Sequence, residues 1–271
     1  MVRIVTVAGS DASGGAGLEA DLKTFEEYGL YGMAAVTLIA TMDPDKNWAH
    51  GVFPVDEKTL KAQMETIFKG VGVTAVKSGM LGTFYAVELT REYITAHQIK
   101  NYVLDPVMVC KGNDEALNPE LNAAVAGKLL PLALVATPNL FEAGQLSGIK
   151  DITTIERMKE AARIISDKGT AHVFVKGGAK LPGAVKAVDI LYDGKTFETL
   201  EAPLIKTNWT HGAGCTTSAA IAAGLARGLS VYDAVVLAKK FISLSLAGSF
   251  ALNRWVGPGN PSGWRKETLF K

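Results

Sequence analysis

The segment THGAGCTTSAAIAAGLARG, residues 210–228, places two glycines and a cysteine directly before a run of small, helix-forming residues. The first turn of a helix carries unpaired N–H groups and the positive end of the helix dipole. Glycines let a ligand approach that backbone closely. We therefore expect Gly212, Ala213 and Gly214 to form an anion site, and we expect the helix end to lower the pKa of the Cys215 thiol beside it.

Outside this segment, short apolar runs alternate with amphipathic stretches. The runs predict strands at residues 2–8, 33–40, 74–80, 101–105, 133–137 and 172–178. Helical spacing between and after them predicts helices that include 83–97, 119–131, 214–228 and 231–248. Near-continuous apolar strands separated by helices indicate an α/β fold with a mostly parallel sheet covered on both faces.

Two local signals add detail to this fold. The pair Asp193-Gly194 lies between two strand-like runs, and this pattern predicts a short antiparallel hairpin. Thr153 is followed three residues later by Glu156, which is the spacing of a capping box at the start of a helix. Because the sequence shows no internal repeat and no linker, we expect one domain over residues 1–271.

The composition excludes several classes of function. The 271 residues carry a net charge of +1 and 48% of them are apolar, which supports a large core and gives no reason to expect nucleic acid or an acidic membrane as a partner. No apolar run reaches the ~18 residues of a membrane span, and the N-terminus meets a polar loop too soon for a signal peptide. We expect a cytoplasmic protein whose two cysteines, Cys110 and Cys215, are free thiols.

Candidate binding residues follow from the position of the strands. In open α/β sheets, ligands bind beyond the carboxyl ends of the strands. The polar segments at these ends are GSDASGGAG at 9–17, Met42-Asp43, Ser78-Gly79-Met80, DPVMVCKG at 105–112, TPNLFEA at 137–143 and Lys176-Gly177-Gly178. The glycine-rich segments match neither the P-loop nor the dinucleotide-binding fingerprint.

Four of the strand-end residues fit a phosphoryl-transfer site. Asp105 ends a strand, and Lys176 stands before two glycines, where its ammonium could bind a phosphate. Asn139 and Glu142 are three residues apart, so that they share a helix face and could hold Mg²⁺ through water. An anion cradle, metal-organising acids and a cation are the parts that phosphoryl transfer uses.

Each of these residues also has a purely structural interpretation. Asp105 is equally typical of a turn or a helix cap. Lys176 is equally typical of a lysine at a sheet edge whose ammonium reaches solvent. A pair such as Asn139 and Glu142 also occurs by chance on surface helices. His211, beside the anion loop, either binds a phosphate or substrate or braces the loop. His50 lies in the polar segment NWAHG, where a histidine is commonly only solvated.

Six stretches of the chain form a recognisable set. In chain order they are AGSDASGGAGLEADLKTF, VKSGMLGT, LDPVMVCKG, TPNLFEA, VKGG and THGAGCT. Together they resemble the ribokinase-like superfamily, and within it the branch of hydroxymethylpyrimidine kinases and bacterial pyridoxal kinases. They are most similar to the pyridoxal kinases of Gram-positive bacteria. The resemblance implies a ribokinase-like three-layer sandwich, ATP and Mg²⁺ as cosubstrates, phosphorylation of a hydroxymethyl group, and a homodimer.

The resemblance also assigns roles to residues. The anion hole for the transferred phosphoryl group matches Gly212, Ala213 and Gly214, and the catalytic base matches Cys215. The ATP-binding positions are Asn139, Lys176, Gly177 and Gly214, and the positions that organise the metal are Glu142 and Asp105. To the substrate pocket we assign Asp11, Met42, His50, Met80, Asp105, Val107 and His211.

Two positions depart from the pyrimidine kinases. Met42 stands where those have a glutamine that hydrogen-bonds the pyrimidine, and a thioether cannot replace the donor and acceptor of an amide. Cys110 stands where those have a small inert residue. Its thiol could add reversibly to the aldehyde of pyridoxal as a hemithioacetal, so that we count it as catalytic; the alternative is a small buried hydrophobic residue.

The sequence therefore predicts an ATP-dependent kinase that phosphorylates the 5′-hydroxymethyl group of pyridoxal, and also acts on pyridoxine and pyridoxamine, the other forms of vitamin B6. One alternative is a hydroxymethylpyrimidine (phosphate) kinase of thiamine biosynthesis. Another is a catalytically inactive, ligand-binding relative. The presence of Asn139, Glu142, Lys176 and the GAGC loop argues against the inactive relative.

Overall fold

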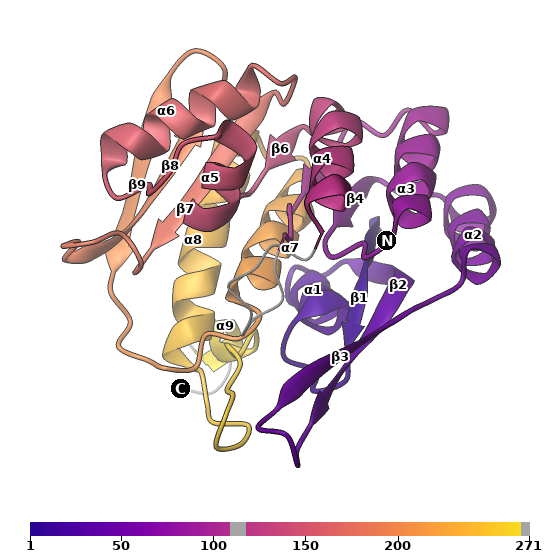
Figure 1. Ribbon diagram of the computed structural model, residues 1–271, viewed down its shortest axis with the longest axis horizontal. Coiled ribbons are helices and arrows are strands. Elements are labelled where there is room, and N and C mark those ends of the chain that lie inside the picture. Colours follow the sequence, from indigo (N-terminus) through magenta and orange to yellow (C-terminus); the bar gives the residue numbers. More distant parts are fainter. Residues whose placement is uncertain (109–117, 267–271) are drawn as a thin grey trace.

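One sheet runs through the molecule. In the computed structural model, which describes residues 1–108 and 118–266, nine strands lie in the order β3-β2-β1-β4-β5-β6-β7-β8-β9 (Figure 1). The parallel strands are β1 (Arg3–Asp11), β2 (Tyr31–Asp43), β4 (Ala75–Ser78), β5 (Tyr102–Leu104), β6 (Val135–Ala136) and β7 (His172–Gly178). The antiparallel strands at the two edges are β3 (Ala49–Pro54), β8 (Lys186–Tyr192) and β9 (Phe197–Pro203).

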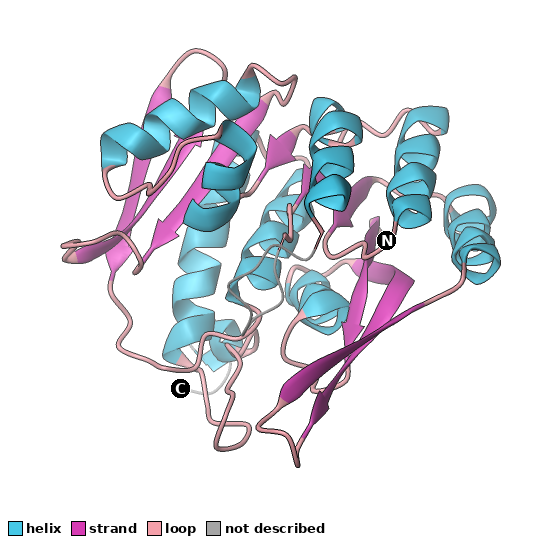
Figure 2. Ribbon diagram, in the orientation of Figure 1, coloured by secondary structure: helices cyan, strands magenta, loops and turns pink. Residues whose placement is uncertain are grey.

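Helices cover both faces of this sheet and make a three-layer sandwich (Figure 2). One layer holds α2 (Glu57–Glu65) with a π-helical turn (Thr66–Val71), α3 (Phe84–Ala96), α4 (Pro119–Lys128) with a 3₁₀ turn (Leu130–Leu132), α5 (Leu140–Ser147) and α6 (Ile155–Ser166). The other layer holds α1 (Gly17–Glu27), α7 (Ala213–Ala226), α8 (Val231–Ala247) and the short α9 (Gly263–Lys266). The predicted α/β class, mostly parallel sheet and hairpin are confirmed.

Helix α7 explains why the segment at 210–228 is so rich in small residues. Every residue from Thr216 to Ala226 is buried, since the helix lies between the sheet, α1 and α8. A helix enclosed on all sides has no polar face, and small side chains let its neighbours approach. The same packing fixes the N-terminus of α7 at the carboxyl edge of the parallel strands.

The β2–β3 hairpin differs from the sequence prediction. The strand expected at 33–40 spans Tyr31–Asp43 and pairs with β3, which we did not predict. His50 lies on β3 opposite Met42, so that its expected place in a polar loop was wrong. Strand β3 is short and largely exposed, and an exposed strand lacks the apolar run that predicts a buried one.

Two further details concern helices. The predicted capping box at Thr153 was wrong by one residue: Thr154 is the N-cap of α6, and its Oγ1 accepts a hydrogen bond from the Arg157 backbone N–H at 3.2 Å. Helix α2 was not predicted at all.

Among the described residues, no helix is both long and apolar enough to cross a membrane.

Candidate active site

Two glycine-rich turns meet at the N-terminus of α7. Gly212 is the N-cap of this helix and has φ 74°, a left-handed conformation that favours glycine. A Cβ on Gly212 would overlap the Gly15 carbonyl, and a Cβ on Gly15 would lie 2.6 Å from the His211 ring. Because glycine has no side chain to cap the helix, the Gly214 N–H of the first turn remains available to an anion, whereas the Ala213 N–H donates to the Thr210 carbonyl at 3.2 Å.

A buried acid–imidazole pair joins these turns. His211 Nε2 lies 2.7 Å from Asp11 Oδ2, and both side chains are less than a tenth exposed. The Asp11 carboxylate also accepts hydrogen bonds from the N–H groups of Ser13 and Ala16, at 2.8 and 2.9 Å. Burial would raise the pKa of Asp11, but the hydrogen bonds from His211 and Ser13 lower it to about 2. These contacts favour the bracing interpretation of His211; a substrate contact of either residue stays a prediction.

The expected cation and acid lie together beside the anion turn. Lys176 Nζ lies 2.9 Å from Asp105 Oδ1, and a Cβ on Gly214 would lie 3.4 Å from the same ammonium. Asp105 also accepts from Ser218 Oγ at 3.0 Å and from Thr137 Oγ1 at 3.2 Å. The interpretations of Asp105 as a cap and of Lys176 as a solvent-reaching lysine are therefore wrong. The two side chains bind each other where the ends of β5 and β7 meet the start of α7.

Charge accounts for the ionisation of Asp105. Burial alone would raise the pKa of this carboxyl, but Lys176 and then Lys77 hold it below its usual range. The carboxylate is thus ionised at neutral pH. Ser218 was missed by the sequence analysis. The sequence gives no signal for it, since Ser218 directly follows Thr216 and Thr217 and nothing distinguishes its hydroxyl from theirs.

Asn139 and Glu142 cap α5. Asn139 is the N-cap, outside the helix, and its Oδ1 accepts from the Glu142 N–H at 3.0 Å, while Glu142 Oε2 accepts from the Asn139 N–H at 2.8 Å. The expectation that both lie on a helix face was therefore wrong. Burial raises the pKa of Glu142 to about 7, although Lys176 opposes this shift. A backbone β-bridge joins Asn139 to Lys176. The metal role of Glu142 and the nucleotide role of Asn139 stay predictions.

The thiol of Cys215 differs from the sequence prediction. Cys215 is partly buried on the first turn of α7. Burial raises its pKa to about 11, and the nearby Lys77 ammonium only partly offsets this effect. The expected lowering by the helix end was thus wrong for the protein without ligands, in which Cys215 carries its proton at neutral pH.

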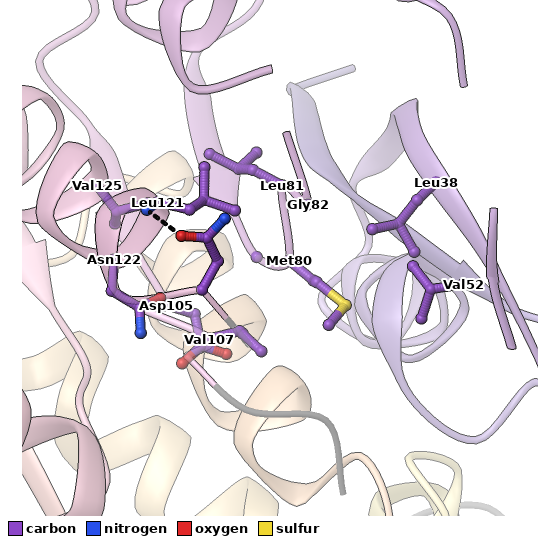
Figure 3. A pocket seen from close by; sticks show the side chains of 12 residues that line it. Leu38, Val52, Met80, Leu81, Gly82, Asp105, Val107, Leu121, Asn122 and Val125 are labelled. Atoms are coloured by element: carbon purple, nitrogen blue, oxygen red, sulfur yellow. Dashed lines mark hydrogen bonds between the residues drawn. The ribbon is translucent and has the colours of Figure 1, made fainter. Parts of the chain in front are cut away.

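Three predicted substrate-pocket residues line one cavity. Met80, Asp105 and Val107 lie around it, and in Figure 3 the Met80 side chain stands between Leu38 and Val52 on one side and the α4 residues on the other. The remaining lining residues are Gly79, Leu81, Gly82, Asn118, Leu121, Asn122 and Val125. The contribution of α4 could not be predicted from the sequence, because nothing in its helical pattern distinguishes a helix that faces a cavity.

Other predicted residues lie apart from this cavity or outside the described part. Met42 and His50 face each other across the β2–β3 hairpin and are not among its lining residues. Gly177 packs against β8, since a Cβ there would overlap the Val188 carbonyl. Cys110 lies outside the described residues. The hairpin tip reaches the loop after α8, where Trp48 stacks on Trp255 with ring centroids 5.3 Å apart.

The residues present fit a nucleotide phosphate and its metal ion. The uncapped first turn of α7 and the neighbouring Lys176 offer N–H donors and a positive charge. Within residues 1–108 and 118–266, no group of three or more His, Cys, Asp or Glu side chains could hold a metal by itself. Asp105 and Glu142 therefore suit Mg²⁺ that keeps water ligands and is shared with phosphates.

The fold and this edge of the sheet are those of a ribokinase-like kinase. The chain belongs to the phosphomethylpyrimidine kinase family, whose sequence profile matches residues 11–260.

Relatives in this family have two named activities. The chain is 52% identical to the pyridoxine kinase of Bacillus subtilis, over 98% of this chain and 97% of that one. It is 34% identical to the hydroxymethylpyrimidine/phosphomethylpyrimidine kinase of the same organism, over 98% and 97% of the two chains. The solved pyridoxal kinase of Staphylococcus aureus in complex with AMP-PCP and pyridoxal has a TM-score of 0.92 and 44% identity, over 98% of this chain and 95% of that one.

Proposed function

We propose that this protein is an ATP-dependent pyridoxal kinase that phosphorylates the 5′-hydroxymethyl group, and that it also accepts pyridoxine and pyridoxamine. The observation that best supports phosphoryl transfer is the Lys176–Asp105 ion pair beside the uncapped N-terminus of α7. The choice of substrate is supported by the relatives, since the identity to the pyridoxine kinase is 52% and that to the pyrimidine kinase of the same organism is 34%.

In this proposal, the chain's own residues bind and neutralise the transferred phosphoryl group. The N–H groups of Gly212, Ala213 and Gly214 donate to its oxygens, and the Lys176 ammonium offsets its charge while Asp105 keeps that ammonium in place. Glu142 and Asp105 would hold Mg²⁺ through water. ATP would supply the phosphoryl group, and the metal ion would neutralise phosphate charge.

Cys215 is the proposed base. Its sulfur accepts the proton of the substrate hydroxyl, whose oxygen then bonds to the γ-phosphorus as ADP leaves. Because the thiol has a pKa of about 11 in the protein without ligands, this role requires positive charge near the sulfur. Met80 and Val107 offer apolar contacts to the substrate ring in the cavity, and Cys110 adds to the aldehyde of pyridoxal.

A coupled kinase assay with pyridoxal, pyridoxine and hydroxymethylpyrimidine tests the proposal. We expect the highest kcat/KM with pyridoxal. A higher value with hydroxymethylpyrimidine would favour the thiamine-pathway kinase, which the family match and the 34% relative support. Transfer to none of the three substrates, with ATP still bound, would instead favour the inactive ligand-binding relative.

We also propose a cytoplasmic homodimer of single-domain chains. The β2–β3 hairpin supports an interface, because Ile39, Val52 and Phe53 are 44, 38 and 59% exposed, and exposed apolar side chains on an edge strand are commonly covered by a partner. Light scattering of the purified protein tests this; a monomer at micromolar concentration would contradict it.

A further inference from the structure

A charged pair lies in the core below the turn that carries Cys215. Lys77 of β4 and Asp21 of α1 are both fully buried, and Lys77 Nζ lies 2.8 Å from Asp21 Oδ2. Thr6, the neighbour of Lys77 on β1, donates from Oγ1 to the same carboxylate oxygen at 2.6 Å. Asp21 Oδ1 is buried with no hydrogen-bond partner in the part of the chain that the structure describes.

The ammonium of Lys77 lies toward the carboxyl edge of the sheet. A Cβ on Gly79, two residues further along the chain, would lie 2.8 Å from Lys77 Nζ, so that the absence of a side chain there leaves room for the ammonium. Helix α7 packs on β4 and on α1. Cys215, on the first turn of α7, lies beside the Gly17 N–H at the start of α1, and Asp21, which binds Lys77, lies one turn further along that helix on the same face. Among the charged groups that act on Cys215, Lys77 is the one that most lowers the pKa of the thiol.

Stability alone does not account for such a pair. Replacing a buried ion pair by well-packed apolar side chains is often neutral or stabilising, because both charges lose their hydration. The unpaired oxygen of Asp21 adds a further desolvation cost. The pair is therefore better explained by what its positive charge does at the neighbouring thiol.

We propose that Lys77 is a positioning residue for Cys215: its ammonium, held by the Asp21 carboxylate that Thr6 also hydrogen-bonds, stabilises the thiolate, which is the form that can accept the proton of the substrate hydroxyl. This inference rests on the proposed function, in which Cys215 is the base. The other groups that act on the thiol are the Asp21 and Asp105 carboxylates, which disfavour the thiolate, the Gly17 N–H, which favours it, and the Lys176 ammonium.

The test is the pH dependence of Cys215 alkylation. The full-length protein is treated with iodoacetamide at several pH values, and modification of Cys215 is followed separately from that of Cys110 by peptide mass spectrometry. Because only the thiolate reacts, Lys77→Met should slow Cys215 alkylation at neutral pH by about tenfold, the effect of losing one nearby opposite charge. Asp21→Asn removes a negative charge but keeps an oxygen that accepts from Lys77, so that it should accelerate the reaction.

The electrostatic role predicts that the alkylation rate of Cys215 falls in Lys77→Met and rises in Asp21→Asn. A merely structural role predicts the same direction in both variants, since both would lose packing. Equal changes in both variants, or no change in either, would overturn the inference. If Lys77→Met does not fold, Asp21→Asn decides alone, and absence of acceleration overturns the inference. As a matched control, Lys239→Met removes the cation of another buried pair, 2.6 Å from Asp189 on β8, and should leave the Cys215 profile unchanged.

Alkylation needs no turnover, so that the two proposals fail separately. A protein that does not phosphorylate pyridoxal, but whose Cys215 responds to Lys77 and Asp21 in opposite directions, contradicts the proposed function and not the electrostatic role. Normal pyridoxal turnover with an unshifted Cys215 profile in both variants contradicts only the inference.

Discussion

Glu142→Gln separates the two properties of this residue, its cap and its charge. Glutamine at the third helical position still accepts from the N-cap N–H, so that the capping box with Asn139 is kept. The variant has no titrating carboxyl. Any difference from the wild type in the pH dependence of stability therefore reports the ionisation of Glu142.

The sign of the effect follows from the raised pKa. Burial moves the pKa of Glu142 from 4.5 to about 7, so that between these values the folded protein binds a proton that the unfolded chain has released. The stabilisation from this proton is fully present below pH 4.5 and is lost as the pH rises through 7. Between about pH 5 and 7.5 the wild type should lose about 2 kcal/mol that the variant keeps.

Urea unfolding of both proteins at pH 5 and at pH 7.5, without nucleotide or metal, measures this difference. The free energy of unfolding of the variant, relative to the wild type, should rise by about 2 kcal/mol between the two pH values. Groups elsewhere in the chain titrate in both proteins and cancel. Parallel pH profiles would show that Glu142 ionises normally, and the account of its burial beside Lys176 would then be wrong.

Three other predictions concern turnover. Cys215→Ala should lower kcat by about 10²- to 10⁴-fold, the usual contribution of a general base, with unchanged ATP affinity by calorimetry; near-normal kcat would exclude Cys215 as base. Met42→Gln should raise kcat/KM for hydroxymethylpyrimidine by up to about tenfold, since one hydrogen bond contributes about 0.5–1.5 kcal/mol, and no gain would assign the choice to other pocket residues. Cys110→Ala should lower kcat/KM for pyridoxal several-fold more than for pyridoxine, which has no aldehyde; equal losses in steady-state assays would refute covalent addition.

The sequence was most informative where a single local rule decides the structure. The glycine turn before α7 and the polar residues at strand ends follow from backbone freedom and from the direction of a parallel sheet. The strand expected at 172–178 has the same bounds as β7, and the strand expected at 2–8 overlaps β1, which starts one residue later and ends three residues later. The position of Lys176 and Asp105 at one edge could thus be predicted, although their contact with Ser218 could not.

The sequence failed where several elements act on one group. The thiol of Cys215 lies at a helix start, which by itself favours a lowered pKa, but burial raises its pKa to about 11, and the Asp21 and Asp105 carboxylates act in the same direction. Lys77 was correctly predicted to lie in a strand, but its ion-pair partner was missed, because no local rule places the carboxylate of Asp21, 56 residues earlier, beside it. Asn139 and Glu142 had the right spacing for a shared face, yet they belong to a cap whose position depends on where α5 begins.

The small residues of α7 have a consequence for conformational entropy. Alanine and glycine lose no rotamer freedom when they are buried. Enclosing this helix on all sides therefore costs less side-chain entropy than enclosing a helix of leucines. Its position is then fixed by backbone packing against the sheet, α1 and α8 and not by rotamers that can rearrange. The turn at its start is therefore held in one place before any anion arrives, and binding there pays little for ordering the protein.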